Sequence, residues 1–227
     1  MTVPATGKPR LDSMLALLQL ASPTLPVGGF AYSQGLEAAI DDGTVHDAAT
    51  ARRWIGDALT LVLARFEAPV WLRVHEAVLA RDQDAVAHWN AEFLAARETA
   101  ELRDEALQMG ASLVRVFPAL HLEPPDLAEM TFTAAFAMAC AQLGIARDEG
   151  LTAYLWAWTE NQVLVAVKTV PLGQQAGQAM LFSLHPAIQH AVEVAGSLGE
   201  EELGTAALGL ALRSARHEIQ YSRLFRS

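Results

Sequence analysis

The sequence predicts an all-α fold, a single-domain bundle of roughly ten helices. Apolar residues recur at helical spacing through most of the chain, alanine and leucine dominate, and the alternating pattern of a strand is nearly absent. The 227 residues are 52% hydrophobic, which is ample for one large core. We expect one helical domain over residues 11–215. A mobile segment (1–10) would precede it, and a basic, aromatic docking tail (216–227) would follow it.

The helical spacing gives the expected order of elements. In the first half we expect helices at about 11–20, 30–40, 44–66, 82–97 and 99–116. A further helix should begin near Pro69 and carry Val70, Trp71, Val74 and Val78. In the second half we expect them at about 131–143, 148–169, 172–184, 187–198 and 201–219. The prolines near residues 118–125 interrupt the pattern without a change in composition, so they do not divide the chain into two domains.

Local signals refine several of these elements. Thr44 and Asp47 have the spacing of a capping box before the third helix. Pro69 fits the first turn of the next helix, where its missing N–H costs nothing. The alanine-rich stretch 131–143 predicts close helix packing. The stretch 148–169 is the longest and is apolar on most faces, which indicates a buried central helix.

Residues 22–37 form the most distinctive stretch. Pro23 and Pro26 forbid a helix through its first half, and Gly28 and Gly29 allow a turn and a close approach to a neighbour. The following apolar residues are spaced as in a helix that begins near Phe30. We expect a rigid connector that acts as a docking surface or a backbone corner, because it contains no nucleophile–base pair and no metal cluster.

Composition excludes several classes of partner and compartment. The net charge of −10 argues against binding to nucleic acid or to an anionic membrane. Cys140 is the only cysteine, so no intramolecular disulfide is possible, which fits a reducing cytoplasm. Neither a convincing signal peptide nor a transmembrane run is present. Only 19% of residues are charged, so few charges are left to spread over the surface. We therefore expect part of the surface to be apolar and to be covered by another subunit.

Glu160, Asn161 and Lys168 are polar residues on the otherwise apolar stretch 148–169. Burial of such groups is costly unless they are paired. They could pair with one another or line a solvated groove, they could form a polar seam used by a partner, or they could line the cleft of an all-helical enzyme. No phosphate loop or nucleophile elbow accompanies Lys168, so catalysis is the weakest of these interpretations.

Two other stretches could bind a partner. Gln174 and Gln178 stack one turn apart after a proline–glycine turn, and they could cap the helix or present a hydrogen-bonding surface. The tail combines Tyr221, Leu224 and Phe225 with arginines, and residues 213–227 carry four arginines against one glutamate. Such a segment either frays or orders when it docks on a partner. None of the seven histidines has the spacing of a metal motif, so we expect no metal site.

Residues 22–37, 160–178 and 216–227 together resemble the UreF family of urease accessory proteins, in colinear order. The resemblance implies an all-α homodimer that is a scaffold rather than an enzyme. Such a protein would bind UreD (also called UreH) and recruit and modulate the GTPase UreG. The complex, a metallochaperone, would deliver nickel to apo-urease. The resemblance implies no cofactor in this chain, because nickel would be handled by the complex.

The resemblance also implies roles for individual residues. Tyr32, Ser33 and Glu37 would lie near a partner-facing or dimer-related surface. Lys168 would control the GTPase step or nickel transfer, and Arg223 would help to hold the GTPase. The tail would dock on UreD/UreH. The remaining candidate partner-binding residues are Glu160, Gln174, Gln178, Tyr221, Leu224 and Phe225.

Overall fold

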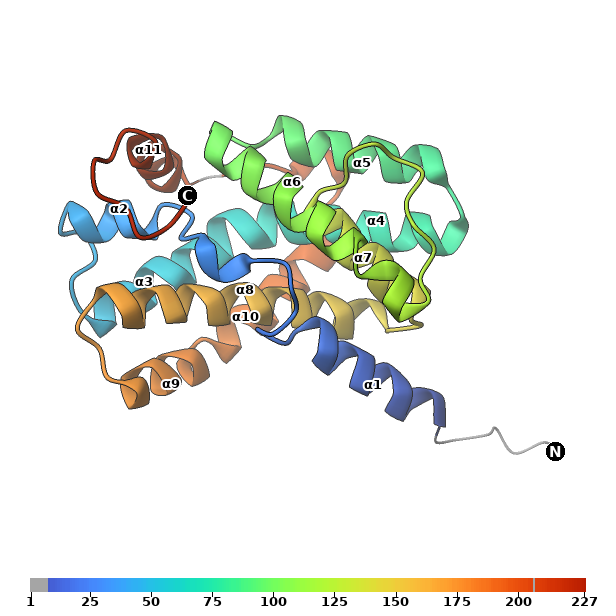
Figure 1. Cartoon of the computed structure of the whole chain (residues 1–227), viewed down its shortest axis with the longest axis horizontal. Helices are drawn as coiled ribbons and strands as arrows, with labels where there is room; N and C mark the ends of the chain where they lie inside the picture. The colour runs from blue at the N-terminus through green and yellow to red at the C-terminus, as the bar shows by residue number, and fades with distance from the viewer. Residues whose placement is uncertain (1–7, 206) are drawn as a thin grey trace.

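The computed structural model describes residues 8–205 and 207–227, and over these residues it is helical without any strand (Figure 1). The all-α bundle is therefore confirmed. Its first helices are α1 (Lys8–Leu20), α2 (Leu36–Asp41), α3 (Ala48–Ala58), α4 (Ala68–Ala80), α5 (Gln83–Ala95) and α6 (Ala100–Val114). The others are α7 (Phe132–Gln142), α8 (Arg147–Thr169), α9 (Gln174–Ser183), α10 (His185–Ser197) and α11 (Leu208–His217). None of these helices is long and apolar enough to cross a bilayer.

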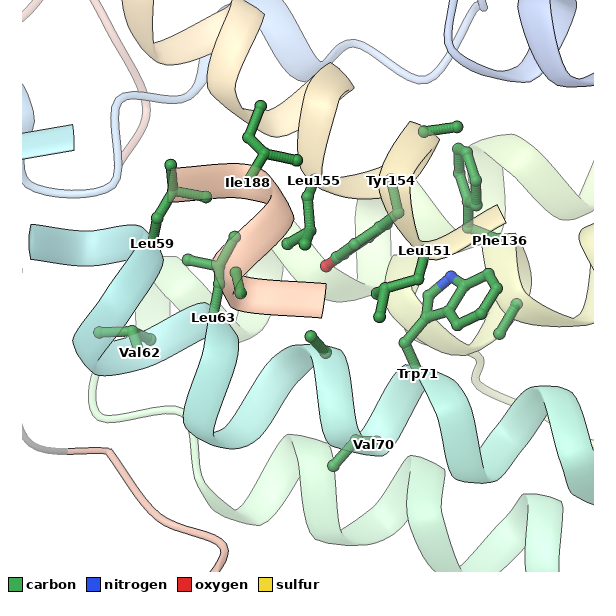
Figure 2. Packing of buried hydrophobic residues seen from close by; sticks show 14 of the residues in the cluster. Leu59, Val62, Leu63, Val70, Trp71, Phe136, Leu151, Tyr154, Leu155 and Ile188 are labelled. Atoms are coloured by element: carbon green, nitrogen blue, oxygen red, sulfur yellow. The ribbon is translucent and has the colours of Figure 1, made fainter. Parts of the chain in front are cut away.

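Helix α8 is the centre of the bundle, as its length and apolar faces predict (Figure 1). It packs against α1, α2, α3, α4, α7, α9 and α10. The core beside it contains Trp71, Phe136, Leu151 and Leu155, which are completely buried (Figure 2). The rings of Phe136 and Tyr154 meet edge to face at 5.6 Å between centroids. Such pairs add to the stabilisation that burial alone provides.

The alanine-rich helix α7 packs closely against its neighbours, as predicted. Its residues from Thr133 to Ala141 are buried. Gly110 of α6 lies directly against the start of α7, where an added Cβ would come within 1.9 Å of the carbonyl oxygen of Met130. Only glycine lets these two backbones approach so closely.

The connector differs from the sequence prediction. The expected helix over residues 30–40 is wrong: a short 3₁₀ turn (Gly29–Ala31) is followed by a bend, and α2 begins only at Leu36. The interruption lies at Gln34 and Gly35, whose φ angles are +50° and +80°. Helical periodicity in the side chains does not reveal this left-handed turn. Gly35 is required there also because its Cα lies beside the backbone of α11.

The predicted capping box is displaced by one turn. Asp47, not Thr44, is the N-cap of α3, and Asp47 and Thr50 each bond the other's backbone N–H. Helix α3 then passes directly into a π-helix (η2, Leu59–Glu67) and on into α4. Pro69 occupies the first turn of α4, as predicted.

The elements at the two ends of the domain also differ from the predicted ones. Of the expected mobile segment, residues 1–7 lie outside the described residues, while α1 already begins at Lys8. The helix expected over 201–219 is two elements, a 3₁₀ turn (Glu200–Glu202) and α11. The last residues of the chain are not helical and turn back over α2 (Figure 1).

Candidate functional site

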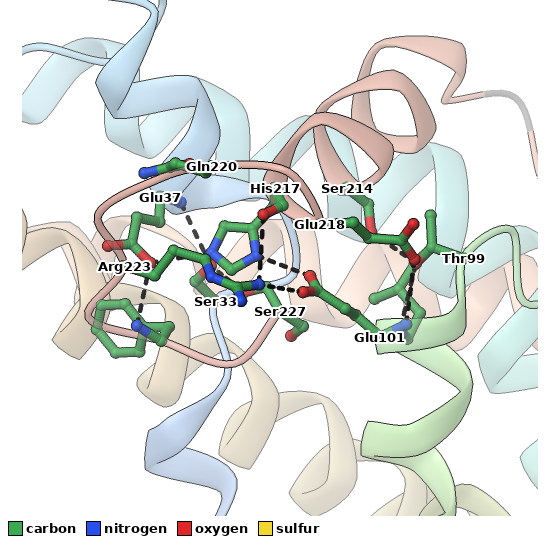
Figure 3. A network of polar contacts seen from close by, with 12 residues as sticks. Ser33, Glu37, Thr99, Glu101, Ser214, His217, Glu218, Gln220, Arg223 and Ser227 are labelled. Atoms are coloured by element: carbon green, nitrogen blue, oxygen red, sulfur yellow. Dashed lines mark hydrogen bonds and ion pairs between the residues drawn. The ribbon is translucent and has the colours of Figure 1, made fainter.

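The C-terminal tail, residues 218–227, folds back onto the connector of its own chain (Figure 3). The backbone N–H of Arg226 donates to the carbonyl of Ala31 at 2.8 Å, and that of Ser33 donates to the carbonyl of Ser227 at 2.9 Å. The Ser33 hydroxyl donates to the same carbonyl. The stiff connector predicted from Pro23, Pro26 and the glycines is therefore the surface that receives the tail. We call this arrangement the tail clamp.

Glu37 is the central acceptor of the tail clamp. Its carboxylate accepts the backbone N–H groups of Leu224 at 2.7 Å and Phe225 at 3.0 Å. Glu37 is only 7% exposed, so both bonds are shielded from water. Hydrogen bonds to a buried charged acceptor are among the stronger ones in proteins. A single side chain near the start of the domain thus fixes the backbone of its last residues.

His217 links the tail clamp to helix α6 (Figure 3). Its Nε2 lies 3.0 Å from Glu37 and its Nδ1 lies 2.7 Å from Glu101, and the ring is completely buried. Both ring nitrogens must carry hydrogens if both contacts are hydrogen bonds, so this geometry fits an imidazolium. Arg223 contributes a second positive charge to Glu101. Glu101 is therefore shared by His217 and Arg223, and His217 also bonds Glu37.

Contacts between α11 and the start of α6 complete the clamp. The hydroxyls of Thr99 and Ser214 are 2.9 Å apart, and Thr99 caps α6 by accepting the N–H of Leu102. The Glu218 carboxylate accepts the N–H of Ala100 at 3.0 Å. A carboxylate is favoured at this end of a helix because the N–H groups of the first turn have no partner within the helix.

A cavity of about 120 Å³ lies between the connector, α6 and α8. Its walls are mostly apolar, and they include Phe93, Met109 and Phe132. Charged and polar side chains line it as well: Gln34, Glu67, Arg97, Glu105, Tyr154, Trp158, Glu160 and Asn161. An apolar pocket with a few convergent polar groups is the usual form of a ligand site.

Glu105 joins this cavity to the tail clamp. Its carboxyl accepts from Gln34 Nε2 at 2.7 Å and from the Ser227 hydroxyl at 2.7 Å. The Gln34 side-chain oxygen in turn accepts from the indole of Trp158 at 2.7 Å. Burial disfavours the charged form and raises the pKa of Glu105 to about 7. This carboxyl therefore titrates near neutral pH.

A second buried acid, Glu67, also lines the cavity. Glu67, the last residue of the π-helix, pairs with Arg97 at 2.7 Å, and both side chains are only 5% exposed. The Tyr154 hydroxyl donates to Glu67 at 3.1 Å. Burial also raises the pKa of this phenol well above its usual range, so Tyr154 is a neutral donor.

The structure brings five of the predicted site residues together in the tail clamp: Ser33, Glu37, Arg223, Leu224 and Phe225. Tyr32 lies beside them and donates to Gln108. Tyr32, Ser33 and Glu37 are buried under the tail and against α6, whereas Tyr221 and Leu224 are exposed. The partner-binding roles of these residues stay predictions.

Residues of α8 and α9 are less closely connected to the clamp. Lys168 is exposed, and its Nζ lies 5.9 Å from the centre of the Phe225 ring. Asn161 donates to the carbonyl of Tyr32 at 3.1 Å, and Glu160 lines the cavity, where burial raises its pKa. Lys168 does not line this cavity, so these three α8 residues do not form one cleft.

Gln174 and Gln178 are exposed on α9, away from the clamp residues. Gly177 between them packs against Val167 and Val163, where an added Cβ would lie 2.7 Å from Val167. Gly177 is therefore a point of close packing between α9 and α8.

Sequence reasoning did not identify Glu67, Arg97, Glu101, Glu105 or His217. One signal was available: Glu105 lies three residues after Leu102 and four before Met109, on the apolar stripe of α6. An acid at such a position is buried and needs partners. Glu67 had no such signal, because the π-helix that carries it changes the helical period. Among the described residues, no group of three or more histidine, cysteine or acidic side chains is placed to hold a metal ion.

Comparison with known proteins identifies the family. A family model named UreF matches residues 45–185. The chain belongs to the UreF family. The urease accessory protein UreF of Azoarcus sp. is 50% identical over 100% of this chain and 99% of its own length. Those of Janthinobacterium sp. and Ralstonia pickettii are 49% and 52% identical, over 95% and 94% of this chain and 99% and 97% of their own. The relatives are named as urease accessory proteins, and the family is not one of enzymes.

Proposed function

We propose that this UreF-family chain is a scaffold for nickel insertion into apo-urease. In this proposal it binds UreD/UreH, recruits the GTPase UreG and modulates it, and works as a homodimer in the cytoplasm. Nickel is handled by the accessory complex, of which this chain is a part. Membership of the family and the similarity to urease accessory proteins support the general role.

The observation that carries the scaffold role is the display of apolar side chains by α11 and the tail. We call this set the C-terminal surface: Leu208, Leu212, Ile219, Tyr221 and Leu224 are each at least half exposed. Large apolar residues gathered on one part of a surface are typical of protein-binding sites. Tyrosine is also among the residues that contribute most to such interfaces.

The tail clamp holds this surface in a fixed conformation. The backbone N–H of Leu224 is bonded to Glu37, while its side chain is 75% exposed. The next side chain, Phe225, is buried. The tail is held by its backbone and by buried side chains such as Phe225. The exposed side chains, such as Leu224, are therefore free to contact a partner. A pre-ordered segment loses less conformational entropy on binding than a disordered one.

Helix α1 provides a second exposed apolar surface. Leu11, Met14, Leu15 and Leu18 are each more than half exposed, and their spacing places them on neighbouring turns. A protein with two separate apolar surfaces fits a role with more than one protein partner, as the proposed contacts with UreD/UreH, UreG and a second copy require.

The test is capture of purified UreD/UreH and UreG by variants of the C-terminal surface. Tyr221→Asp and Leu224→Asp place a charge at exposed positions and leave the backbone bonds to Glu37 intact. We expect each to lose at least tenfold in affinity, about 1.4 kcal/mol, for one of these partners. Leu79→Asp is the matched control, because Leu79 is equally apolar and 63% exposed but lies on α4. Wild-type capture of both partners by both tail variants would contradict the proposal.

A further inference from the structure

The carboxylate of Glu160 has no partner of its own in the fold. Within the described parts of the chain no hydrogen-bond donor or basic side chain reaches it, although it lines the cavity between the connector, α6 and α8. Burial raises the pKa of Glu160, which means that its charged form is poorly solvated. The residue is only partly buried, so a group that enters the cavity can contact it. A cationic donor would stabilise this carboxylate.

Asn161, the next residue of α8, provides a second acceptor. Its side-chain nitrogen donates to the carbonyl of Tyr32 at 3.1 Å, whereas its side-chain oxygen has no donor among the described residues. Asn161 also lines the cavity and is partly buried. Leu20 and Ala21, at the C-terminal end of α1, line the same cavity, and this end of a helix carries a partial negative charge. These features favour the same kind of group, a cation that donates hydrogen bonds.

The other charges of the lining agree with this preference. Arg97 is the only basic residue among the described residues that line the cavity, and Glu67 pairs with it at 2.7 Å. Burial raises the pKa of Glu105 to about 7, so its carboxyl is neutral in a large share of molecules near neutral pH and negative in the rest. With Glu160 ionised, the net charge of the lining is therefore negative. A single positive charge complements it, whereas an anion would be repelled.

The apolar walls of the cavity restrict the cation further. Met109, Phe132 and Leu164 are among them, so the charged group must be attached to an apolar stem. A water molecule needs roughly 10–15 Å³, so the cavity of about 120 Å³ has room for a short alkyl chain and its charged end. The side chain of lysine has this form, since its methylene groups pack on apolar surface while its ammonium group donates up to three hydrogen bonds.

We propose that this cavity receives the side chain of a lysine from a protein partner. The ammonium group would donate to Glu160 and Asn161, and the methylene groups would lie against Met109 and Phe132. The inference deepens the scaffold proposal and rests on it, because the lysine belongs to a protein that the scaffold binds. The C-terminal surface offers mainly apolar contacts, and the cavity adds a contact that depends on charge at a different position.

The first test uses n-butylammonium, which is the lysine side chain without its backbone, and the isolated full-length protein labelled with ¹⁵N. Trp158 lines the cavity, and its indole N–H is one of five tryptophan resonances, assigned by its loss in Trp158→Phe. If that variant does not fold, magnetisation transfer to the Gln34 side chain, which accepts this N–H, gives the assignment. We expect a saturable shift with n-butylammonium. 1-Butanol should bind at least tenfold more weakly, and butyrate should leave the resonance in place.

Glu160→Gln tests the charge without changing the shape of the side chain. It should weaken n-butylammonium binding roughly tenfold and leave the response to 1-butanol unchanged. Glu149→Gln is the matched control, because Glu149 is an exposed acid of the same helix that does not line the cavity. The proposal is overturned if the Trp158 resonance does not respond to n-butylammonium, or if butyrate shifts it equally. Equal n-butylammonium affinity of Glu160→Gln and wild type would also overturn it.

The second test asks whether the ammonium group belongs to a partner. Glu160→Lys should capture purified UreD/UreH or UreG at least tenfold more weakly than wild type, with Glu149→Lys as the control. Excess n-butylammonium should compete with the same partner for the wild-type protein, which keeps the test valid if Glu160→Lys does not fold. If n-butylammonium binds but neither change affects capture, the site takes a free amine and the proposal is overturned. Failure of the wild type to capture either partner would instead refute the scaffold role, and this inference with it.

Discussion

The substitution Glu105→Gln should change how the stability of the protein depends on pH. In the folded chain the pKa of Glu105 is about 7, against an ordinary value of 4.5. Between these values the folded state holds a proton that the unfolded state has released. The contribution of Glu105 to stability therefore falls as pH rises from about 4.5 to about 7, and it is constant above that range.

The size of the effect follows from the two pKa values. The difference corresponds to about 3 kcal/mol, because one pH unit is worth about 1.36 kcal/mol. The amide introduced by Glu105→Gln would keep the shape of the side chain and stay neutral at every pH. It would accept from Gln34 through its oxygen, and the Ser227 hydroxyl could rotate to accept from its NH₂ group. We therefore expect the variant to be more stable than wild type by about 3 kcal/mol at pH 8 and to differ little from it at pH 4.5.

Urea denaturation at pH 4.5, 6 and 8, followed by tryptophan fluorescence, measures this difference. Asp104→Asn is the control, because Asp104 is the neighbouring acid on α6 and is exposed. Its free energy of unfolding should follow the wild-type pH profile. The reasoning is refuted if the stability difference between Glu105→Gln and wild type is the same at all three pH values.

Three further predictions concern packing, the clamp and α8. Gly110→Ala should destabilise the fold by about 3 kcal/mol or more, because the new Cβ would collide with the carbonyl of Met130. Urea denaturation measures this loss, and a value below about 0.5 kcal/mol would contradict the close approach of α6 and α7. Glu37→Gln should weaken the tail clamp by about 2 kcal/mol and speed tryptic cleavage within residues 216–227, and unchanged cleavage would argue against its central role. Lys168→Ala should leave the unfolding curve intact, because Lys168 is exposed, yet lower urease activation in a reconstituted maturation assay. Wild-type activation and nickel content would count against a role for this lysine.

The helical architecture was predictable because it depends on repeated local signals. Apolar spacing and Pro69 each act over a few residues, so the sequence reveals them directly. The errors arose where backbone conformation outweighs side-chain periodicity. Gln34 adopts a positive φ although it is not glycine, and no composition rule predicts that turn.

The candidate site could be predicted only in part, because its contacts join segments that lie far apart in the sequence. The connector and the tail were both recognised as distinctive stretches, but nothing local indicates that they bind each other. Glu37 and His217 are 180 residues apart, and their contact depends on how α2, α6 and α11 come together. The buried pair of Glu67 and Arg97 likewise exists only in the folded chain, since neither residue stands out in its own segment.

The long sequence separation within the tail clamp has a consequence for biosynthesis. Ser33 and Ser227 are 194 residues apart, so the connector leaves the ribosome long before its closing segment exists. At about 5–20 residues per second, this interval lasts on the order of 10–40 s. During that time the donor groups of Ser33 and the acceptor oxygens of Glu37 are without their native partners in the tail, while much of the bundle can already form. The tail clamp thus closes only after residues 218–227 have been synthesised, and until then nothing holds the tail in its folded conformation.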